Sequence, residues 1–288
     1  MSSLSDDIRK LLKRYNIRPS KKRGQSFLSS HRVARDIVDI AELSKDDSVL
    51  EIGGGLGVLT QKIAEKAGKV YVIEVDSNLV QALQDTLKEC TNITIIEGDA
   101  LKVDLPKTNK IVANLPYSIS SEITFRILRE MKFQDAVLMY QKEFAARLVA
   151  KPGTPEYSRL TINVQYYARI EEVMEVSADL FYPVPMVDSM VVRMIPRVNG
   201  SYAKDDSIFH WMIGGIYPYP NKNLRKALRI WFRNIKLDKE LPDELLSRLE
   251  SVVKGDERLR SIGMEELVRM ADVLLLLIED GMIPDPRV

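Results

Sequence analysis

The sequence predicts an open α/β fold with a mostly parallel sheet and an antiparallel edge strand, followed by a smaller all-helical C-terminal domain. Between residues 46 and 141, apolar runs rich in β-branched residues alternate with helical stretches, as in sheets covered by helices on both faces. From about residue 200 onward only helical patterns remain. We therefore expect two domains, at residues 1–199 and 200–288, joined by a linker with the sequence VNGSYAKDD.

The expected strands follow one another along the chain with helices between them. Several of them lack the polar alternation of a half-exposed strand, which indicates burial on both faces of a parallel sheet. Helical stretches at 58–67 and 77–90 separate the first three, and another at 157–169 precedes two β-branched runs that we assign to antiparallel strands at the sheet edge. The runs are, in order, SVLEIG, KVYVIEVD, NITIIEGD, KIVANLP, AVLMYQ, IEEVMEVSADLF and MVVRMIP.

The composition argues against several kinds of chemistry. One cysteine (Cys90) and two histidines (His31 and His210) cannot form a disulfide framework, and they disfavour a Cys/His metal site or a histidine-based triad. The N-terminus lacks the apolar block of a signal peptide, and the longest apolar run, VLLLLI, is too short to span a bilayer. We expect a soluble, cytoplasmic monomer without a metal or a membrane partner.

Two basic segments lie far apart in the sequence. Residues 1–35 carry ten Lys/Arg against two Asp, and residues 217–237 carry six Lys/Arg and no acid. At ~100° per residue, Leu224, Leu228, Trp231 and Ile235 fall on one helix face and the basic residues on the other. A solvated basic surface is the alternative, but two such segments favour a bound polyanion. The candidate residues for contacting its phosphates, which the family resemblance described below assigns to RNA, are Lys21, Lys22, Arg23, Lys222, Arg225, Lys226, Arg229 and Arg233.

A glycine-rich turn follows the first strand. The stretch VLEIGGGLGVLT has glycines at 53, 54, 55 and 57, where a backbone without Cβ atoms can turn sharply and let a ligand approach the next helix. The dinucleotide fingerprint requires a further glycine at the position of Val58. The turn therefore indicates a nucleotide-type ligand but disfavours a nicotinamide cofactor.

Acidic residues close the next two strands at the same edge of the sheet. Glu74 and Asp76 are both candidates to accept hydrogen bonds from ribose hydroxyls, and Asp99 is a candidate to accept one from the exocyclic amine of adenine. Each alone could be an ordinary loop residue. Together, beside a glycine turn and without nearby positive charge, they predict a pocket for an adenosine instead of a phosphate cradle.

Several motifs in sequence order then carry a resemblance to a known family. The chain resembles the small-subunit ribosomal RNA adenine dimethyltransferases, a family of class I S-adenosylmethionine-dependent methyltransferases with a Rossmann-like sheet. NKNLRKALR (221–229) is similar to the basic C-terminal helix of that family. The other motifs are GQSFL (24–28), EIGGGLG (51–57), IEVD (73–76), GDA (98–100), NLPYSISS (114–121), QKEFAARL (141–148), SRLTINVQYYA (158–168) and FYPVPMVDS (181–189).

The resemblance implies S-adenosyl-L-methionine as the cofactor, S-adenosyl-L-homocysteine as its product, and a set of residues that bind them. Two positions depart from the family pattern, because Ser26 and Gly54 stand where relatives often have Asn and Pro. Serine keeps a hydrogen-bonding group, and glycine keeps the turn flexible. By resemblance the cofactor residues are Gln25, Ser26 and Leu28 at the methionine end, Gly53 and Gly55 at the backbone approach, Glu74 at the ribose, Asp99 and Ala100 at the adenine, and Asn114.

The motif NLPY predicts how an adenine amine is made reactive. Its lone pair is delocalised into the ring, so the Asn114 side-chain oxygen and the Leu115 carbonyl would accept its two hydrogens and aim the nitrogen at the methyl group. Pro116 would stiffen the loop, and Tyr117 would stack on the flipped-out base. By resemblance Phe181 forms the second face of the stack. The simpler alternatives are a turn with an exposed ring, and a core role for Phe181.

The function implied by the resemblance is dimethylation of two adjacent adenosines near the 3′ end of small-subunit rRNA, with a role in small-subunit biogenesis. The expected partner is therefore rRNA in a pre-ribosomal small subunit. Alternative hypotheses are a methyltransferase of large-subunit rRNA, a DNA adenine methyltransferase, and a non-catalytic assembly factor that uses the same fold.

Overall fold

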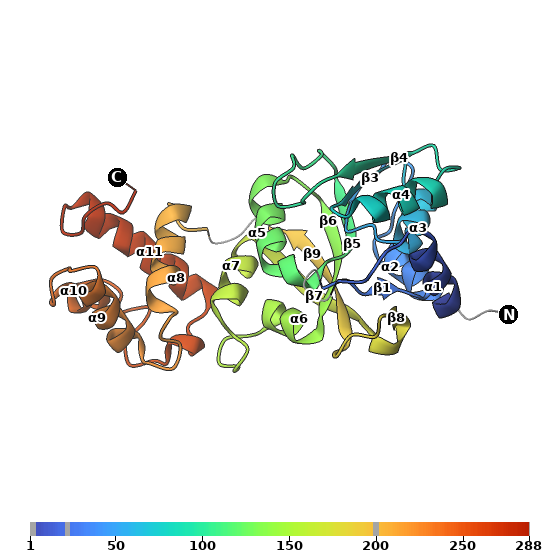
Figure 1. Cartoon of the computed structure of the whole chain (residues 1–288). Helices are drawn as coiled ribbons and strands as arrows, with labels where there is room; N and C mark the ends of the chain where they lie inside the picture. Colours follow the sequence, from blue (N-terminus) through green and yellow to red (C-terminus); the bar gives the residue numbers. More distant parts are fainter. Residues whose placement is uncertain (1–3, 21–23, 198–201, 288) are drawn as a thin grey trace. The chain divides into compact units, whose positions relative to one another are not determined.

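The computed structural model describes residues 4–20, 24–197 and 202–287, and they form two compact units. The first contains Met1–Ala145 and Ala168–Pro196, and the second contains Ala146–Tyr167 and Arg197–Val288. Figure 1 shows an α/β unit, coloured blue to yellow, and a helical unit that ends in red. The sequence placed the whole of 1–199 in the first domain, whereas 146–167 groups with the helical unit because several of its apolar residues belong to that core.

The α/β unit is built on a seven-stranded sheet with the order β4-β3-β2-β5-β6-β9-β7. The five expected parallel strands are all present, from β4 to β6 in this order. β9 is antiparallel to both β6 and β7, so the antiparallel strand lies at the expected end of the sheet, one place in from the edge. The strands are β2 (Ser48–Ile52), β3 (Lys69–Glu74), β4 (Ile93–Glu97), β5 (Lys110–Asn114), β6 (Asp135–Gln141), β7 (Ala168–Val176) and β9 (Ser189–Pro196).

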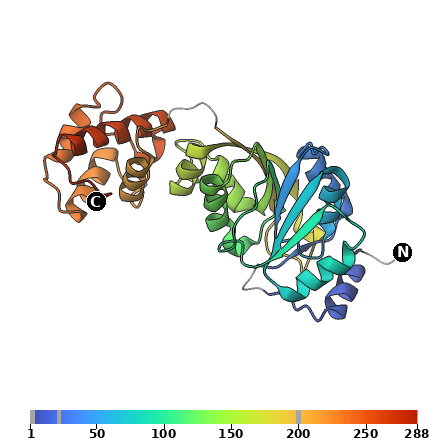
Figure 2. The same cartoon turned by 90° about the horizontal axis from the view of Figure 1, so that it is seen from above.

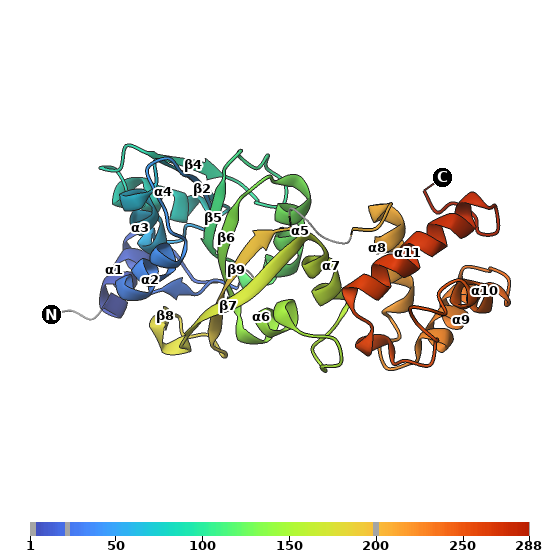
Figure 3. The same cartoon turned by 180° about the vertical axis from the view of Figure 1, so that it is seen from behind.

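Helices cover both faces of this sheet (Figures 2 and 3). On one face, α2 (His31–Ile40), α3 (Val58–Lys66) and α4 (Ser77–Thr86) pack apolar side chains against buried valines of the strands. On the other lies α5 (Ser120–Glu130), and the hydroxyls of Thr124 and Tyr140 on β6 are 2.7 Å apart. After α5 and β6 comes α6 (Lys142–Val149), and a short 3-10 turn, η1 (Tyr117–Ile119), precedes α5.

Two short strands join segments that are distant in the sequence. β1 (Phe27–Leu28) pairs antiparallel with β8 (Phe181–Tyr182), which follows the 3-10 turn η2 (Ala178–Leu180). The N-terminal helix α1 (Leu4–Arg14) packs Ile8 and Leu12 into a cluster with Phe27, Leu56 and Leu79. The sequence patterns predicted neither the pairing nor the helix. This part of the fold brings the GQSFL and FYPVPMVDS motifs together.

The helical unit has its own apolar core. It contains α7 (Arg159–Tyr167), α8 (Asp206–Ile216), α9 (Leu224–Asn234), α10 (Leu241–Ser247), the 3-10 turn η3 (Leu259–Ser261) and α11 (Met264–Glu279). Tyr166 on α7 stacks on Phe209 on α8, with 4.2 Å between ring centroids. Among the described residues, none of the helices has the length and apolarity that a membrane crossing requires.

The amphipathic helix expected around residues 224–235 is α9. Leu224, Leu228 and Trp231 are buried as predicted, at 0%, 0% and 4% exposure. Ile235 was expected on the same face and is 37% exposed, because the helix ends at Asn234 and Ile235 is its C-cap. The prediction for Ile235 was therefore wrong, and the apolar face is shorter than the periodicity suggests.

Candidate active site

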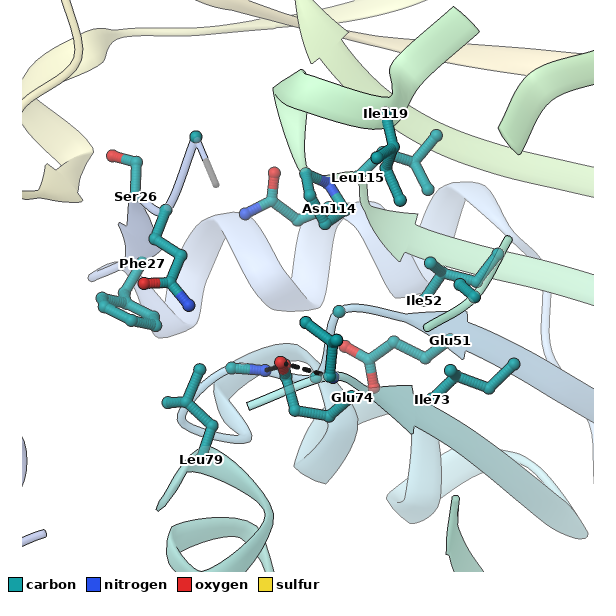
Figure 4. Close-up of a pocket in the computed structure, with 18 of the residues that line it drawn as sticks. Ser26, Phe27, Glu51, Ile52, Ile73, Glu74, Leu79, Asn114, Leu115 and Ile119 are labelled. Carbon is teal, nitrogen blue, oxygen red and sulfur yellow. Dashed lines mark hydrogen bonds between the residues drawn. The ribbon is translucent and has the colours of Figure 1, made fainter. Parts of the chain in front are cut away.

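A cavity of about 260 Å³ opens at the carboxyl ends of β2, β3 and β5. β2 lies between β3 and β5, so this is the point where the strand order reverses and where ligands bind in open α/β sheets. Figure 4 shows side chains from these strands and from the N-terminal segment converging on the cavity. Among the residues that line it are Gln25, Ser26, Leu28, Gly53, Gly55, Glu74, Asp99, Ala100, Asn114, Leu115, Pro116 and Tyr117.

Two glycines of the first turn are required by their conformation and by their neighbours. Gly53 and Gly55 have φ values of 80° and 56°, in the left-handed region that side chains disfavour. A Cβ on Gly53 would lie 3.1 Å from Pro116 Cγ, and one on Gly55 would lie 3.2 Å from the ring of Phe27. The turn therefore fits closely between the NLPY motif and the N-terminal segment.

Glu74 at the end of β3 is held by backbone groups inside the cavity. Its side chain accepts hydrogen bonds from the N–H groups of Gly55, Val75 and Asp76 at 3.0, 2.9 and 3.1 Å. Burial nevertheless raises the pKa of Glu74. Asp76 instead caps α4 by accepting a bond from the N–H of Asn78, and it does not line the cavity. The geometry thus favours Glu74 over Asp76 as the carboxylate that meets a ligand.

The end of β4 supplies the predicted adenine position. Asp99 lines the cavity, and one of its oxygens accepts a hydrogen bond from the N–H of Leu101 at 2.9 Å. Ala100 is buried beside it, with its carbonyl accepting a bond from Arg126 on α5 at 2.6 Å. The other Asp99 oxygen lies 3.8 Å from Lys102. A carboxylate and a small apolar side chain therefore stand together at this end of the cavity.

The GQSFL segment forms another wall of the cavity and is fixed by local bonds. Gln25 accepts a hydrogen bond from the N–H of Ser20 at 2.8 Å, and the Ser26 hydroxyl donates to the carbonyl of Pro183. Leu28 is 5% exposed and pairs with Phe181 across β1 and β8. The hydroxyl at position 26 therefore connects the cofactor wall to the FYPVPMVDS motif.

Asn114 is the last residue of β5, and its side chain points into the cavity (Figure 4). Within the described parts of the chain, no hydrogen bond ties its amide to another residue. The next residue, Leu115, donates its N–H to the carbonyl of Met139 on β6 at 3.3 Å, which holds the backbone after the strand. The backbone next to Asn114 is thus held in place, while the side-chain amide of Asn114 can bond a ligand.

Tyr117 is anchored at the cavity by its hydroxyl, whereas Phe181 is buried outside the cavity lining. The hydroxyls of Tyr117 and Ser189 on β9 are 2.6 Å apart, and burial raises the pKa of Tyr117. Phe181 is 2% exposed, belongs to the apolar core under the sheet, and does not line the cavity. In this structure its ring presents no face to a base, so its stacking role stays a prediction.

The buried carboxyl of Glu51 belongs to the cavity and was not among the predicted site residues. It is 1% exposed at the end of β2, and its Oε2 atom has no hydrogen-bond partner. Burial, and to a smaller degree the charge of Glu74, raise the pKa of Glu51 to about 8. A signal was present in the sequence, because Glu51 is an acid between the apolar strand residues Leu50 and Ile52, two positions before the first glycine of the turn. The unpartnered oxygen fits a cationic ligand group.

The basic face of α9 is exposed but partly occupied. Arg225 and Arg229 both form ion pairs with Asp243 on α10. For Lys222, Lys226 and Arg233 no ion pair is recorded in the described ranges. Lys21, Lys22 and Arg23, the N-terminal part of the prediction, lie outside the residues that the structure describes.

Fold and cavity together place the chain in a protein class. The antiparallel strand β9, inserted between β6 and β7, distinguishes this sheet from the all-parallel sheets that bind nicotinamide dinucleotides. Its ligand site presents buried carboxylates where a pyrophosphate would need positive charge. These are the properties of a class I methyltransferase, which uses S-adenosylmethionine as the methyl donor.

Comparison with known proteins narrows the class to one family. The profile of the family described as "Ribosomal RNA adenine dimethylase" matches residues 16–254. The chain therefore belongs to the ribosomal RNA adenine dimethylase family, and the predicted family, fold class and enzyme activity are confirmed. The catalytic reaction is S-adenosylmethionine-dependent dimethylation of rRNA adenine.

Individual relatives agree with this assignment. A "Probable ribosomal RNA small subunit methyltransferase A" of Methanococcoides burtonii is 45% identical over 84% of this chain and 91% of its own, and the protein of the same description from Methanosarcina mazei is 43% identical over 93% and 97%. A dimethyladenosine transferase from Plasmodium falciparum aligns with a TM-score of 0.75 at 28% identity, over 89% of this chain and 98% of its own. The 23S rRNA methyltransferase ErmE aligns with 0.65 at 27%, over 86% and 99%.

Proposed function

We propose that this enzyme dimethylates two adjacent adenosines near the 3′ end of small-subunit rRNA, within an immature small subunit. The small-subunit substrate is supported by the descriptions of the Methanococcoides and Methanosarcina relatives. The chemistry is supported above all by Asn114, whose amide points into the cavity from the end of β5 without a partner among the described residues. The two adenosines and the assembly stage rest on the family resemblance of the motifs.

Asn114 and Leu115 would activate the adenine amine by accepting its hydrogens. The Asn114 side-chain oxygen takes one and the Leu115 carbonyl takes the other, which turns the nitrogen lone pair toward the cavity. When bound, S-adenosylmethionine supplies an electrophilic methyl group at its sulfonium. A monomethylated amine keeps only one N–H, so the second round uses one acceptor and leaves room for a methyl group at the other.

Pro116 and Tyr117 would hold the loop and the base. Pro116 packs against Gly53, so the loop that carries the Leu115 carbonyl cannot shift without disturbing the cofactor turn. Tyr117 is anchored to Ser189, and its ring could stack on the adenine once the base is flipped out. Stacking on one aromatic face is worth about 1–3 kcal/mol.

The carboxyl groups of the cavity would bind the cofactor by its polar parts. Glu74 accepts from the ribose hydroxyls with the lone pairs that its backbone bonds leave free, and Asp99 accepts from the adenine amine. Glu51 with its unpartnered oxygen is suited to a cationic group at the methionine end. Because a cation favours the ionised carboxyl, binding should release a proton and strengthen as the pH rises toward about 8, the pKa of Glu51.

The helical unit would contact rRNA through the basic face of α9. Lys226 and Arg233 on this face, and Lys222 just before the helix, are exposed and form no ion pair within the described ranges, so they can contact phosphates. Holding immature rRNA and methylating it are compatible roles, because the basic face and the cavity lie in different units of the chain.

Methyl transfer to immature ribosomal particles tests the proposal. The protein is incubated with methyl-labelled cofactor and immature small subunits, and mass spectrometry of the digested rRNA locates dimethyladenosine. We expect label at two adjacent adenosines near the 3′ end. Label only in large-subunit rRNA or in DNA would support the alternative methyltransferases. If no label is incorporated at any salt concentration, only the non-catalytic assembly role remains.

A further inference from the structure

The basic face of α9 is divided into an open half and an occupied half. On a helical projection the four basic residues inside the helix, Arg225, Lys226, Arg229 and Arg233, span an arc of about 100°. Arg225 and Arg229 lie toward one side of this arc, and both bind the carboxylate of Asp243. Nη2 of Arg229 is 2.8 Å from one oxygen of Asp243, while Arg225 bonds the other oxygen. A single oxyanion is thus held between two guanidinium groups.

This arrangement has the form of a phosphate subsite. Guanidinium groups bind carboxylates and phosphates with the same fork of N–H donors, so an Asp side chain can occupy a position suited to a phosphate. Arg225 is further oriented by a 2.9 Å bond to the carbonyl of Lys254. Lys226, the next residue in the chain, and Lys254 are both exposed, while the nearby Glu257 carboxylate is bound to the N–H groups of Lys254 and Gly255. The group best suited to replace the carboxylate is therefore a phosphate of a polyanion.

The Asp243 carboxylate is also easy to displace. The side chains of Arg225, Arg229 and Asp243 are 32%, 55% and 44% exposed. Ion pairs this open to water contribute little to folding, and they weaken further as salt rises. The contact between α9 and α10 is made by buried leucines, among them Leu228 and Leu245, and does not depend on the ion pair.

We propose that Arg225 and Arg229 form an RNA phosphate subsite, which the Asp243 carboxylate fills in the free protein and an RNA backbone phosphate fills in the complex. The inference rests on the proposed rRNA-binding role of α9, and it adds that the Asp243 carboxylate competes with RNA phosphate for the two arginines. Asp243 then limits the affinity for RNA in general. Because binding at α9 alone is then weak, the enzyme favours an RNA that also contacts other parts of the chain.

Asp243→Asn tests the subsite with a labelled RNA hairpin as the probe, using fluorescence anisotropy over a series of salt concentrations. We expect binding at low salt to tighten about two- to fivefold, the size of an exposed ion pair, with a steeper dependence on salt. Glu250→Gln is the matched control. It removes one exposed carboxylate from the same unit, and no ion pair of Glu250 is recorded in the described ranges.

A double-mutant comparison separates the subsite from a general charge effect. Replacing Arg225 and Arg229 with Ala should abolish the gain from Asp243→Asn, because the freed arginines produce it. A gain that survives without the arginines, an equal gain in Glu250→Gln, or unchanged affinity in a folded Asp243→Asn protein would each overturn the proposal. Wild-type protein that binds neither the hairpin nor immature subunits would contradict the proposed function instead.

The wild-type protein provides a check that needs no variant. Adding the hairpin should shift the guanidinium NMR signals of Arg225 and Arg229, as their partner changes from carboxylate to phosphate. If the hairpin binds but both signals keep the chemical shifts of the RNA-free protein, the arginines remain paired with Asp243 and the proposal is wrong.

Discussion

The cavity of the α/β unit and the basic face of the helical unit use polar groups in opposite ways. In the cavity, Glu51 and Glu74 are 1% and 5% exposed, and their ionisation depends on what surrounds them. On α9 the charged side chains are exposed and depend on salt and on one carboxylate, Asp243. Substitutions in the cavity should therefore change chemistry and pH dependence, whereas substitutions on α9 should change affinity and its salt dependence.

The largest effect is expected from Asn114→Ala. Removing one of two acceptors aimed at the reacting amine should lower kcat by about 10²–10³, as loss of a positioned transition-state group does. Affinity for RNA should stay nearly unchanged, because the Asn114 amide holds no other residue in the described chain. Single-turnover methylation of immature small subunits measures the rate. Asn78→Ala, at the exposed start of α4, is the control, and a fully active Asn114→Ala would refute the acceptor role.

Glu51→Gln should alter the dependence of stability on pH. The pKa of Glu51 is about 8 in the folded chain and about 4.3 when unfolded, so the folded state binds the extra proton between these values. Stability due to this group is therefore fully present below pH 4 and is lost as pH rises toward 8, by up to ~1.4 kcal/mol per unit. Glutamine should remove this slope.

Urea unfolding of the free protein at pH 6, 7 and 8 compares wild type with Glu51→Gln. Other groups also titrate, so the difference between the two proteins is the quantity that isolates Glu51. Glu250→Gln, which changes an exposed carboxyl, should follow the wild type. Parallel curves for wild type and Glu51→Gln would mean that Glu51 is ionised in the folded chain across this range.

Gly55→Ala should weaken cofactor binding about tenfold. An alanine in the left-handed conformation costs about 1–2 kcal/mol, and relief of this strain would displace the turn from the geometry that binds the cofactor. Gly55 has φ 56°, its added Cβ would meet the ring of Phe27 at 3.2 Å, and its N–H serves Glu74. Gly153→Ala is a sharp control, because φ is 91° there and no atom lies within 4 Å of the added Cβ. Calorimetry should show weaker cofactor binding in Gly55→Ala only, and equal affinities would contradict the close fit of the turn.

The smallest effects per residue are expected on α9. Lys226→Ala and Arg233→Ala should each weaken binding of the RNA hairpin a few-fold and reduce the slope of log affinity against log salt by about one. The methylation rate at saturating concentrations of immature small subunits should be unchanged. Lys132→Ala, an exposed lysine of the α/β unit, is the matched control. If its effect equals that of Lys226→Ala, the basic face has no special role.

Much of the fold and the cavity could be predicted because their signals are local. A buried parallel strand is an apolar run, a left-handed turn needs glycine, and a polar residue that ends such a strand stands at the edge where ligands bind. Gly53, Gly55, Glu74, Asp99 and Asn114 were found in this way and all line one cavity. Their meeting is imposed by the parallel sheet.

The parts that could not be predicted depend on contacts between distant segments. The sequence around Phe181 allowed a core role, but it did not indicate the pairing with Leu28, because that partner lies far away in the sequence. The periodicity of α9 identified its basic face but not Asp243, which belongs to another helix. The role of Asp76 as a helix cap instead of a ligand group depends on where α4 begins, which patterns locate only within a few residues.

The pairing of β1 with β8 has a consequence for the newly made chain. The backbone N–H of Ser29 bonds the carbonyl of Leu180, 151 residues further on, and Ser26 bonds Pro183. The wall of the cavity formed by Gln25 and Ser26 therefore cannot be fixed until the ribosome has synthesised that later segment and released it from the exit tunnel. During translation the five parallel strands from β2 to β6 can pair first, with their cofactor edge still open, whereas β9 is synthesised only after β8. The enzyme therefore becomes competent only after most of its α/β unit has been completed.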